Sequence, residues 1–227
     1  MSGVELLKNV SFFAGLSERE LDSLANCLAR RTFARGVIIF HEGSPGRTLY
    51  IIESGKVRIF VLSESGREIT VNIYGPGDVF GELALLDGLP RSAGAMVLEK
   101  TTVLTLHRDD FLWHLREYPE MARSIIEVLS ARLRYTTVHA ESLAFLDVYG
   151  RVAEKVLELA ERYGVERGEA IEIDLALTQA ELASWVAATR EHVNKVLGTF
   201  RDQGLIEIDG QTITLLDRER LRRRTLG

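Results

Sequence analysis

One stretch decides how this chain is interpreted, residues 80–93, with the sequence FGELALLDGLPRSA. A turn cluster, GPGD at residues 75–78, precedes it, and the helical run that Gly81 opens is too short to be a packing element. What remains is a free helix N-terminus, whose unpaired N–H groups favour a phosphate. Glu82 lies in that first turn, and Arg91 follows nine residues later. An acid for a ribose hydroxyl and a planar cation for a phosphate are what a cyclic nucleotide needs.

Residues 80–86, followed by PRSA at 90–93, closely resemble the phosphate-binding cassette of cyclic-nucleotide-binding domains, found in bacterial cyclic AMP receptor proteins and in protein kinase A regulatory subunits. The resemblance implies that Gly81 offers its backbone N–H and that Glu82 takes the ribose 2′-hydroxyl. It also implies that Arg91 and Ser92 hold the cyclic phosphate, with Leu83 as a further ligand contact. The alternative is that Glu82 is only an acid favoured by the helix dipole and Arg91 a solvated surface residue.

The composition limits the kinds of protein that this chain can be. The chain has 227 residues, 46% hydrophobic and 27% charged, which is ordinary for a soluble globular protein of one large or two modest domains. No apolar run approaches the roughly 18 residues of a membrane span, and the start lacks the order of a signal peptide, so we expect a cytoplasmic protein without a membrane partner. The net charge of −5 argues against indiscriminate nucleic-acid binding. A lone cysteine, Cys27, excludes an internal disulfide.

The region around the cassette has short β-rich runs separated by glycine turns, one of them at residues 63–66. Many short strands with the cassette among them predict a β jelly roll. A metal-dependent cupin enzyme is the alternative, but it needs clustered histidines, and this region offers only His41 and His107; no metal is therefore expected. Short helices are predicted over residues 4–34, with a capping box at Ser17. The predicted strands are residues 37–40, 48–53, 56–62, 69–74, 95–97 and 102–106.

After His107 the apolar spacing becomes helical, and we expect a dimerisation helix over about 109–146. Apolar residues recur there at spacings of 4 and 3 over about three heptads. The natural partner for such a seam is the same helix of a second subunit, so a homodimer is predicted. The alternative is a long helix lying on its own sheet. The seam consists of Ala122, Ile126, Leu129, Leu133, Thr136, Ala140 and Leu143.

Two adjacent hydroxyl residues, Thr136 and Thr137, lie at this seam. A β-branched residue there can serve packing alone, although a buried hydroxyl needs a partner. In cyclic AMP receptor proteins two adjacent hydroxyl residues at this place reach the adenine amino group, one from each subunit. RLRYTT at residues 132–137, leading into LAFLD at 143–147, is similar to that family. The resemblance implies adenine rather than guanine, with cyclic AMP as an effector that bridges the dimer.

The sequence predicts an α+β protein of two domains. Residues 1–146 are the expected cyclic-nucleotide-binding jelly-roll domain with the dimerisation helix, and residues 147–227 the expected winged helix-turn-helix DNA-binding domain. Residues 145–147 are interpreted as the hinge between them. The elements expected next are a helix over 148–163, capped by Asp147 and closed by Gly164 at its C′ position, a charged loop over 164–169 and a strand over 170–175.

A helix-turn-helix pattern follows. Thr178 and Glu181 are spaced as a capping box that opens one helix. After a break at residues 187–188, Thr189 caps a second helix over 190–201. Its apolar residues share one face, so its polar residues point away from that face. These polar residues cluster toward the N-terminal half, which is the end of a recognition helix that meets base edges in the major groove. The residues predicted to contact DNA are Thr178, Gln179, Thr189, Arg190, Glu191, Asn194 and Lys195.

Two strands, over residues 205–208 and 212–216, complete a winged helix, because the Asp209-Gly210 pair between them is a strong hairpin signal. The tail RERLRRR at residues 218–224 is basic and able to touch phosphates. A frayed, solvated terminus is the interpretation that we favour for it.

LTQAELA at residues 177–183 and TREHV at 189–193 resemble the helix-turn-helix of the same family, so the resemblance to the cyclic AMP receptor branch of the CRP/FNR regulators covers nearly the whole chain. It departs in two places. Residues 187–188 are both alanine where the family often has glycine, which a tight turn tolerates less well. Lys195 stands where the enteric receptor protein has arginine, so a bidentate guanine contact there becomes a single-point one.

The resemblance implies a homodimeric transcription regulator, not an enzyme, that is controlled allosterically by cyclic AMP and works with RNA polymerase. We expect Arg190 to contact guanine and Glu191 a cytosine amino group, in a palindromic operator of TGTGA-type half-sites. One alternative keeps the fold but responds to haem, redox state or another small molecule, or is constitutively active; Cys27 alone disfavours cluster sensing. The other alternative, an enzyme using Glu82 or the scattered histidines, lacks a nucleophile and base at a readable spacing.

Overall fold

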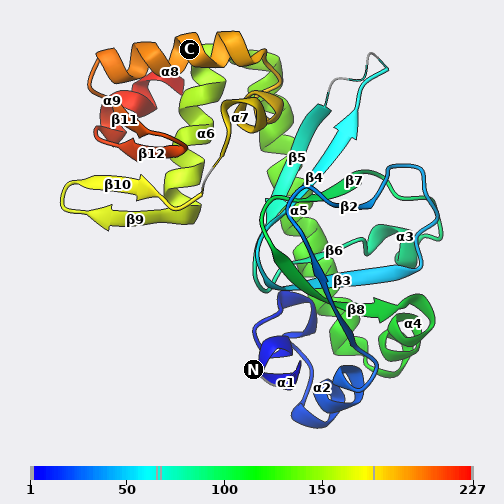
Figure 1. Cartoon of the computed structure of the whole chain (residues 1–227). Helices are drawn as coiled ribbons and strands as arrows, with labels where there is room; N and C mark the ends of the chain where they lie inside the picture. Colours follow the sequence, from blue (N-terminus) through cyan, green and yellow to red (C-terminus); the bar gives the residue numbers. More distant parts are fainter. Residues whose placement is uncertain (1–2, 65, 67, 176, 226–227) are drawn as a thin grey trace. The chain divides into compact units, whose positions relative to one another are not determined.

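The chain forms two compact units, residues 1–134 and 135–227 (Figure 1). The division falls inside one long helix, so the C-terminal part of that helix belongs to the second unit. The expected division into domains at residue 146 stays a prediction. The computed structural model describes residues 3–64, 66, 68–175 and 177–225.

The first unit begins with short helical elements, as the sequence predicts. The Ser17 N–H donates to a carboxylate oxygen of Glu20 at 2.6 Å, and the predicted capping box is confirmed. The prediction of helices up to residue 34 is wrong at its end, because residues 29–33 form strand β1. This strand pairs along its whole length with β8 (Thr101–His107), and that tertiary pairing overrides a weak local preference. The helical elements are α1 Gly3–Leu7, the 3-10 helix η1 Ser11–Phe13 and α2 Glu18–Ala25.

Two four-stranded antiparallel sheets form the predicted β jelly roll. One sheet has the order β1-β8-β3-β6 and the other β2-β7-β4-β5. Strand β6 was not expected, because two residues are too few to show a period. The predicted turn at residues 63–66 includes Ser65, which lies outside the described residues. The remaining strands are β1 Ala29–Phe33, β2 Ile38–Phe40, β3 Thr48–Ser54, β4 Val57–Leu62, β5 Glu68–Tyr74, β6 Val79–Phe80 and β7 Gly94–Val97.

The core of the first unit lies on both faces of the β1-β8-β3-β6 sheet. Side chains alternate along β3, as the pleat requires. Leu49 and Ile51 join a buried cluster with the N-terminal helices, whereas Ile52 joins a second cluster with Val57 and Ala95 of the other sheet. The two clusters hold β6 in place, and β6 delivers the chain directly into the cassette.

The long helix is shorter than expected. A helix α4 (Arg108–Glu117) ends before Tyr118, and the helix predicted to mediate dimerisation is α5 (Pro119–Phe145). Tyr118 is extended, with φ −121° and ψ 90°, because the residue before a proline avoids the helical region. Pro119 is at the first position of α5, where its missing N–H has no cost. None of the helices in the described ranges combines the length and apolar character needed to cross a membrane.

The second unit continues with α6 (Val148–Tyr163). The carboxylate of Asp147 accepts a hydrogen bond from the Gly150 N–H at 2.8 Å, which confirms the predicted cap. Gly164 ends the helix, but its φ of −75° is not the left-handed conformation usual for a C′ glycine. Glycine is required at this position for a steric reason, because a Cβ there would collide with the Ala160 carbonyl and with the Ile171 side chain.

The charged loop predicted after α6 is also wrong, because β9 (Gly164–Arg167) pairs with β10 (Ala170–Ile173) as a hairpin. A third sheet results, with the order β11-β12-β10-β9. Strands β11 (Ile206–Asp209) and β12 (Thr212–Leu215) form the predicted wing.

The helix-turn-helix consists of α7 (Gln179–Trp185) and α8 (Arg190–Asp202). The Thr178 hydroxyl accepts from the Glu181 N–H at 3.2 Å, so the predicted capping box is confirmed. In the turn Ala187 has a φ of +51°, the left-handed conformation that side chains disfavour. Of the alanine pair noted in the sequence, Ala187 thus stands where glycine is sterically favoured.

The prediction of a frayed C-terminus is wrong for residues up to 225. Helix α9 (Arg218–Arg222) and a 3-10 turn, η2 (Arg223–Thr225), follow the wing. Leu221 is fully buried, and Arg218 forms an ion pair with Glu161 of α6. The tail therefore packs on the second unit through the Leu221 side chain and the Arg218 ion pair. A single apolar residue shows no periodicity, so this packing has no signal in the sequence.

Candidate functional site

The cassette is a tight turn followed by one turn of helix. Strand β6 ends at Phe80, Gly81 has a φ of +80°, and helix α3 spans Leu83–Leu86 with Glu82 as its N-cap. The Leu85 N–H donates to the Glu82 carbonyl at 2.9 Å, which closes the turn. The short helix predicted from the sequence is therefore present, and it begins two residues after Gly81.

Arg91 is buried beside this turn, with 5% of its surface exposed. Its guanidinium donates to the Gly81 carbonyl at 2.6 Å and to the Thr48 carbonyl at 2.7 Å. The same group lies over the Phe40 ring at 4.2 Å from the centroid and near the Tyr50 ring at 5.8 Å. Arg91 is therefore not a solvated surface residue.

The charge of Arg91 is not balanced by an ion pair in the described part of the chain, although the charge of Glu82 acts on it favourably. Among the residues that the structure describes, no carboxylate pairs with it, and its Nε–H has no hydrogen-bond partner. Burial lowers the pKa of Arg91, although a guanidinium stays protonated in proteins. A buried cation held by carbonyls and an aromatic ring is a site that an anion would stabilise.

Two glycines make room for this guanidinium. A Cβ on Gly81 would lie 2.6 Å from Nη1 of Arg91, in addition to the strain of its positive φ. A Cβ on Gly46 would lie 2.9 Å from Nε of Arg91 and would collide with Ala84. The family resemblance implies a donor role for the Gly81 N–H, and the structure adds a steric reason for glycine at this position.

Glu82 is buried, with 4% exposed, and forms an ion pair with Arg132 of α5. Nη1 of Arg132 lies 2.8 Å from Oε1 of Glu82, and Nη2 donates to the Val79 carbonyl at 2.5 Å. The guanidinium also lies 4.6 Å from the Tyr74 ring centroid and 5.5 Å from that of Phe12. Sequence reasoning missed Arg132, because its partner is 50 residues away and no local pattern links them.

The other predicted ligand residues occupy different surroundings. Ser92 is exposed. The backbone beside it is held in place, because the N–H of the preceding residue, Arg91, donates to the Ser44 carbonyl at 2.9 Å. Leu83 is 42% exposed on α3. Thr136 and Thr137 are exposed on the part of α5 that belongs to the second unit. The structure thus brings Gly81, Glu82 and Arg91 together in the first unit, and the two threonines lie in the other.

The recognition helix has the amphipathic arrangement predicted from the sequence. Its apolar residues Val193, Val196, Leu197 and Phe200 are buried, which anchors one face. The residues predicted to reach DNA bases are all exposed: Arg190, Glu191, Asn194 and Lys195.

The threonines at the helix starts serve as caps. The Thr189 hydroxyl accepts from the His192 N–H at 3.2 Å. Thr178 donates its hydroxyl to Glu181 at 2.8 Å, and Gln179 begins α7 beside it. These contacts fix both helix N-termini.

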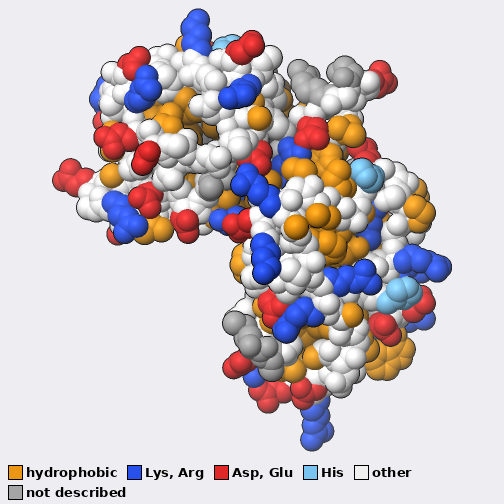
Figure 2. Space-filling view, viewed as in Figure 1, with side chains coloured by type: hydrophobic (Ala, Val, Ile, Leu, Met, Phe, Trp, Pro, Cys, Tyr) orange, Lys and Arg blue, Asp and Glu red, His pale blue; other side chains and the backbone are white. Residues whose placement is uncertain are grey.

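On the face drawn in Figure 2, acidic and basic side chains are interspersed in both units. Within the described ranges, no group of three or more histidine, cysteine, aspartate or glutamate residues is arranged to hold a metal ion. The net charge of −5 favours DNA contact through a few placed residues.

Two family models match the chain. A cyclic nucleotide-binding domain matches residues 30–118, from β1 to α4 with the whole cassette. A Crp-like helix-turn-helix domain matches residues 150–224, from α6 to the docked tail. The two matches correspond to the jelly roll and the winged helix described above.

Individual proteins agree with these matches. The CRP-like cAMP-activated global transcriptional regulator of Mycobacterium tuberculosis is 39% identical over 220 residues, 97% of this chain and 98% of that protein. The crystal structure of the Thermus thermophilus catabolite activator protein is 32% identical, with a TM-score of 0.55, over 96% of this chain and 99% of that one. The c-di-GMP responsive regulator CLP of Xanthomonas campestris is 25% identical, with a TM-score of 0.78, over 88% and 99%. These relatives are regulators and not enzymes, and the chain belongs to the CRP/FNR family of DNA-binding transcription regulators with a cyclic-nucleotide-binding domain.

Proposed function

We propose that this regulator is a homodimer whose DNA binding is controlled allosterically by cyclic AMP. The observation that carries the proposal is the buried guanidinium of Arg91, which has no carboxylate partner in the described chain and lies beside the Gly81 turn. A cyclic phosphate supplies the missing negative charge. A DNA-binding regulator of this kind acts in the cytoplasm.

The nucleotide is held by groups from the cassette. Arg91 and Ser92 bind the cyclic phosphate, aided by the Gly81 N–H, and Leu83 contacts the ligand from α3. A guanidinium has five N–H donors, and two of those of Arg91 are engaged with carbonyls, so capacity for a phosphate remains. Glu82 takes the ribose 2′-hydroxyl, since a carboxylate paired with Arg132 can still accept hydrogen bonds.

Adenine is assigned to Thr136 and Thr137. Thr136 follows Arg132 by four residues, one turn of the same helix, about 6 Å along its axis. In a helix, residues i and i+4 share a face. The assignment is supported by the similarity of residues 132–137 to cyclic AMP receptor proteins, in which the two adjacent hydroxyls reach the adenine amino group, one from each subunit.

The dimer is supported by an apolar face on α5. Ile126 is 64% exposed and Leu133 is 69% exposed in the single chain. The seam residues Thr136, Ala140 and Leu143 continue the exposed face toward the C-terminal end. Large apolar side chains repeating at heptad spacing and left uncovered are stabilised by the same helix of a second copy.

DNA is read by α8, in a palindromic operator with TGTGA-type half-sites. Arg190 contacts guanine, Glu191 accepts from a cytosine amino group, and Asn194 and Lys195 extend the contact along the groove. The capped N-termini at Thr178, Gln179 and Thr189 bind phosphates and set the register. RNA polymerase is the further partner that membership of this family suggests.

Cyclic AMP can control DNA binding because a two-fold operator requires the two recognition helices to lie about 34 Å apart, in successive major grooves. Cyclic AMP favours the arrangement with this spacing by its differential affinity, typically about 1–3 kcal/mol of coupling. The effector and DNA therefore increase each other's affinity.

The test is binding to a TGTGA-type palindrome at about 0.15 M salt, without nucleotide, with cyclic AMP and with cyclic GMP. We expect cyclic AMP to strengthen operator binding at least about fivefold. The variant Arg91→Leu should lose nucleotide binding, whereas Arg30→Leu, which removes an exposed cation of β1, should not. Equal operator affinity in all three conditions would leave the family assignment intact and refute cyclic AMP as the effector.

A further inference from the structure

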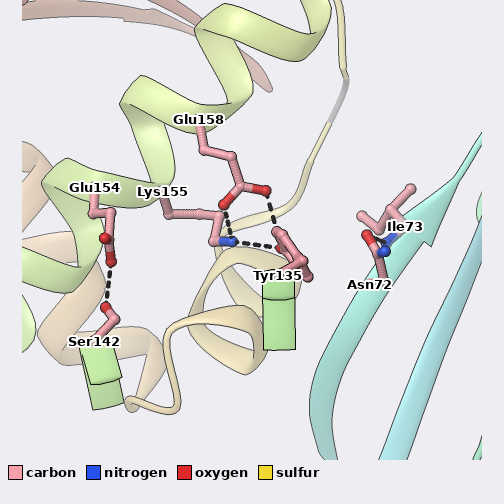
Figure 3. Close-up of polar contacts among 7 residues, drawn as sticks. All are labelled: Asn72, Ile73, Tyr135, Ser142, Glu154, Lys155 and Glu158. Atoms are coloured by element: carbon pink, nitrogen blue, oxygen red, sulfur yellow. Dashed lines mark hydrogen bonds and ion pairs between the residues drawn. The ribbon is translucent and has the colours of Figure 1, made fainter. Parts of the chain in front are cut away.

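The C-terminal part of α5 is tied to α6 by a buried polar network within the second unit. The Tyr135 hydroxyl donates to Oε1 of Glu158 at 3.0 Å and accepts from Nζ of Lys155 at 3.2 Å. Lys155 also forms an ion pair with Glu158. Figure 3 shows the three side chains converging between the two helices. One helical turn of α5 is thus held by two hydrogen bonds to charged groups, which are stronger than neutral ones.

Burial makes this network sensitive to loss of any member. Lys155 is only 4% exposed, and burial lowers its pKa, while Glu158 opposes that shift. Burial also raises the pKa of Tyr135, with the Glu158 charge acting in the same direction, so the hydroxyl keeps its proton as a donor. Each charged member therefore needs the others.

The network extends to the helix-turn-helix. Nζ of Lys155 lies 4.4 Å from the centroid of the Trp185 ring, and Trp185 is the fully buried last residue of α7. A second polar contact joins the same two helices, since Ser142 of α5 donates to Glu154 of α6 (Figure 3). A chain of direct contacts therefore runs from Tyr135 through Lys155 to the first helix of the DNA-binding motif.

We propose that Tyr135 is a positioning residue that couples the nucleotide to the recognition module. This rests on the proposed function, because Tyr135 immediately precedes Thr136 and Thr137, to which that function assigns the adenine. A base contact that fixes the backbone of residues 136–137 also fixes the neighbouring hydroxyl, and through it the position of α6 and α7 relative to α5.

The decisive variant is Tyr135→Phe, which removes the hydroxyl and leaves the Lys155–Glu158 ion pair in place. Cyclic AMP is titrated calorimetrically into the full-length protein with and without the TGTGA-type operator. The ratio of the two affinities is the coupling, commonly about 5–150-fold. We expect Tyr135→Phe to bind cyclic AMP within about twofold of wild type when DNA is absent, and to lose at least about threefold of the coupling. A purely structural role would not move this ratio.

Two further variants keep the test sharp. Tyr118→Phe makes the same chemical deletion at the end of α4, outside the network, and should keep full coupling. Ser142→Ala removes the second contact between α5 and α6 and should reduce coupling in the same direction, so it replaces Tyr135→Phe if that variant folds poorly. Full coupling in a folded Tyr135→Phe or Ser142→Ala protein, beside a coupled wild type, overturns the inference alone. An uncoupled wild type overturns it together with cyclic AMP control.

Discussion

Arg132 of the long helix α5 and Glu82 of the cassette form an ion pair with 2.8 Å between Nη1 and Oε1, and the Glu82 side chain is only 5% exposed. The pair fastens the N-terminal half of α5 to the turn that defines the ligand site. Removal of one member leaves the other charge buried without a partner, which is usually more costly than losing both.

Arg132→Leu should therefore lower the free energy of unfolding by about 3 kcal/mol and weaken nucleotide binding, because Glu82 is left as an isolated buried carboxylate. Urea denaturation monitored by circular dichroism measures the loss. Arg123→Leu is the matched control on the same helix, since its partner Glu127 is exposed, and a change within about 0.5 kcal/mol is expected. Equal effects of the two substitutions would contradict the assignment of a buried pair.

Gly81→Ala should reduce cyclic AMP affinity strongly, because its Cβ would lie 2.6 Å from Nη1 of Arg91. Gly88 is the control, since its φ of +75° is similar but a Cβ there meets nothing closer than 3.9 Å. Gly88→Ala should cost only the conformational term, about 1 kcal/mol of stability, and leave affinity unchanged. Calorimetric titration with cyclic AMP compares the two; equal losses of affinity would show that the backbone conformation, not the clash with Arg91, is responsible.

Leu133→Glu should convert the proposed dimer to a monomer, because it places a charge in the centre of the exposed α5 face. Sedimentation velocity at micromolar concentration distinguishes the two states. Leu62→Glu introduces the same charge at another large apolar side chain, 50% exposed on β4, and should leave the mass unchanged. A Leu133→Glu protein that sediments as wild type would exclude α5 as the dimer contact.

Gly198→Ala should stabilise the protein by about 0.5–1 kcal/mol, because Gly198 is inside α8 and a Cβ there meets no atom within 4 Å. Gly164→Ala should act in the opposite direction, by about 1–3 kcal/mol, since its Cβ would collide with the Ala160 carbonyl. Thermal unfolding of both variants measures whether each substitution raises or lowers the stability. A stabilising Gly164→Ala would contradict the close packing between the end of α6 and β10.

Stability should fall as the pH drops below about 6.5, because of His139 on α5. Burial lowers its pKa from 6.5, Lys155 and Arg151 act in the same direction, and Glu158 and Glu154 oppose them. The folded state therefore binds this proton less readily than the unfolded chain, and acid favours unfolding by at most about 1.4 kcal/mol per pH unit.

The measurement is the unfolding midpoint between about pH 5.5 and 7.5, where an ordinary histidine titrates. His139→Asn should flatten the dependence in this range. His192→Asn alters an exposed histidine of α8 and should leave the slope as in wild type. An unchanged slope in His139→Asn would mean that other groups account for the acid sensitivity.

Much of the fold was predictable because its signals are local. Strand periods between glycine turns predicted six strands of the jelly roll, and the caps at Thr178 and Thr189 placed both helices of the DNA-binding motif. The strand at residues 29–33 was missed, because only pairing with β8 makes it a strand. The docking of the tail was missed for the same reason, since burial of Leu221 depends on the surface of α6.

The sequence by itself determined the two folded modules and the position of the cassette turn, because turn, cap and periodicity signals act over a few residues. Only the tertiary structure decided what the buried charges contact. It brings Arg132 to Glu82 across 50 residues and Tyr135 to Glu158 across 23. Contacts over such separations are selected by the desolvation of charge in the folded core, a condition that no local sequence pattern records.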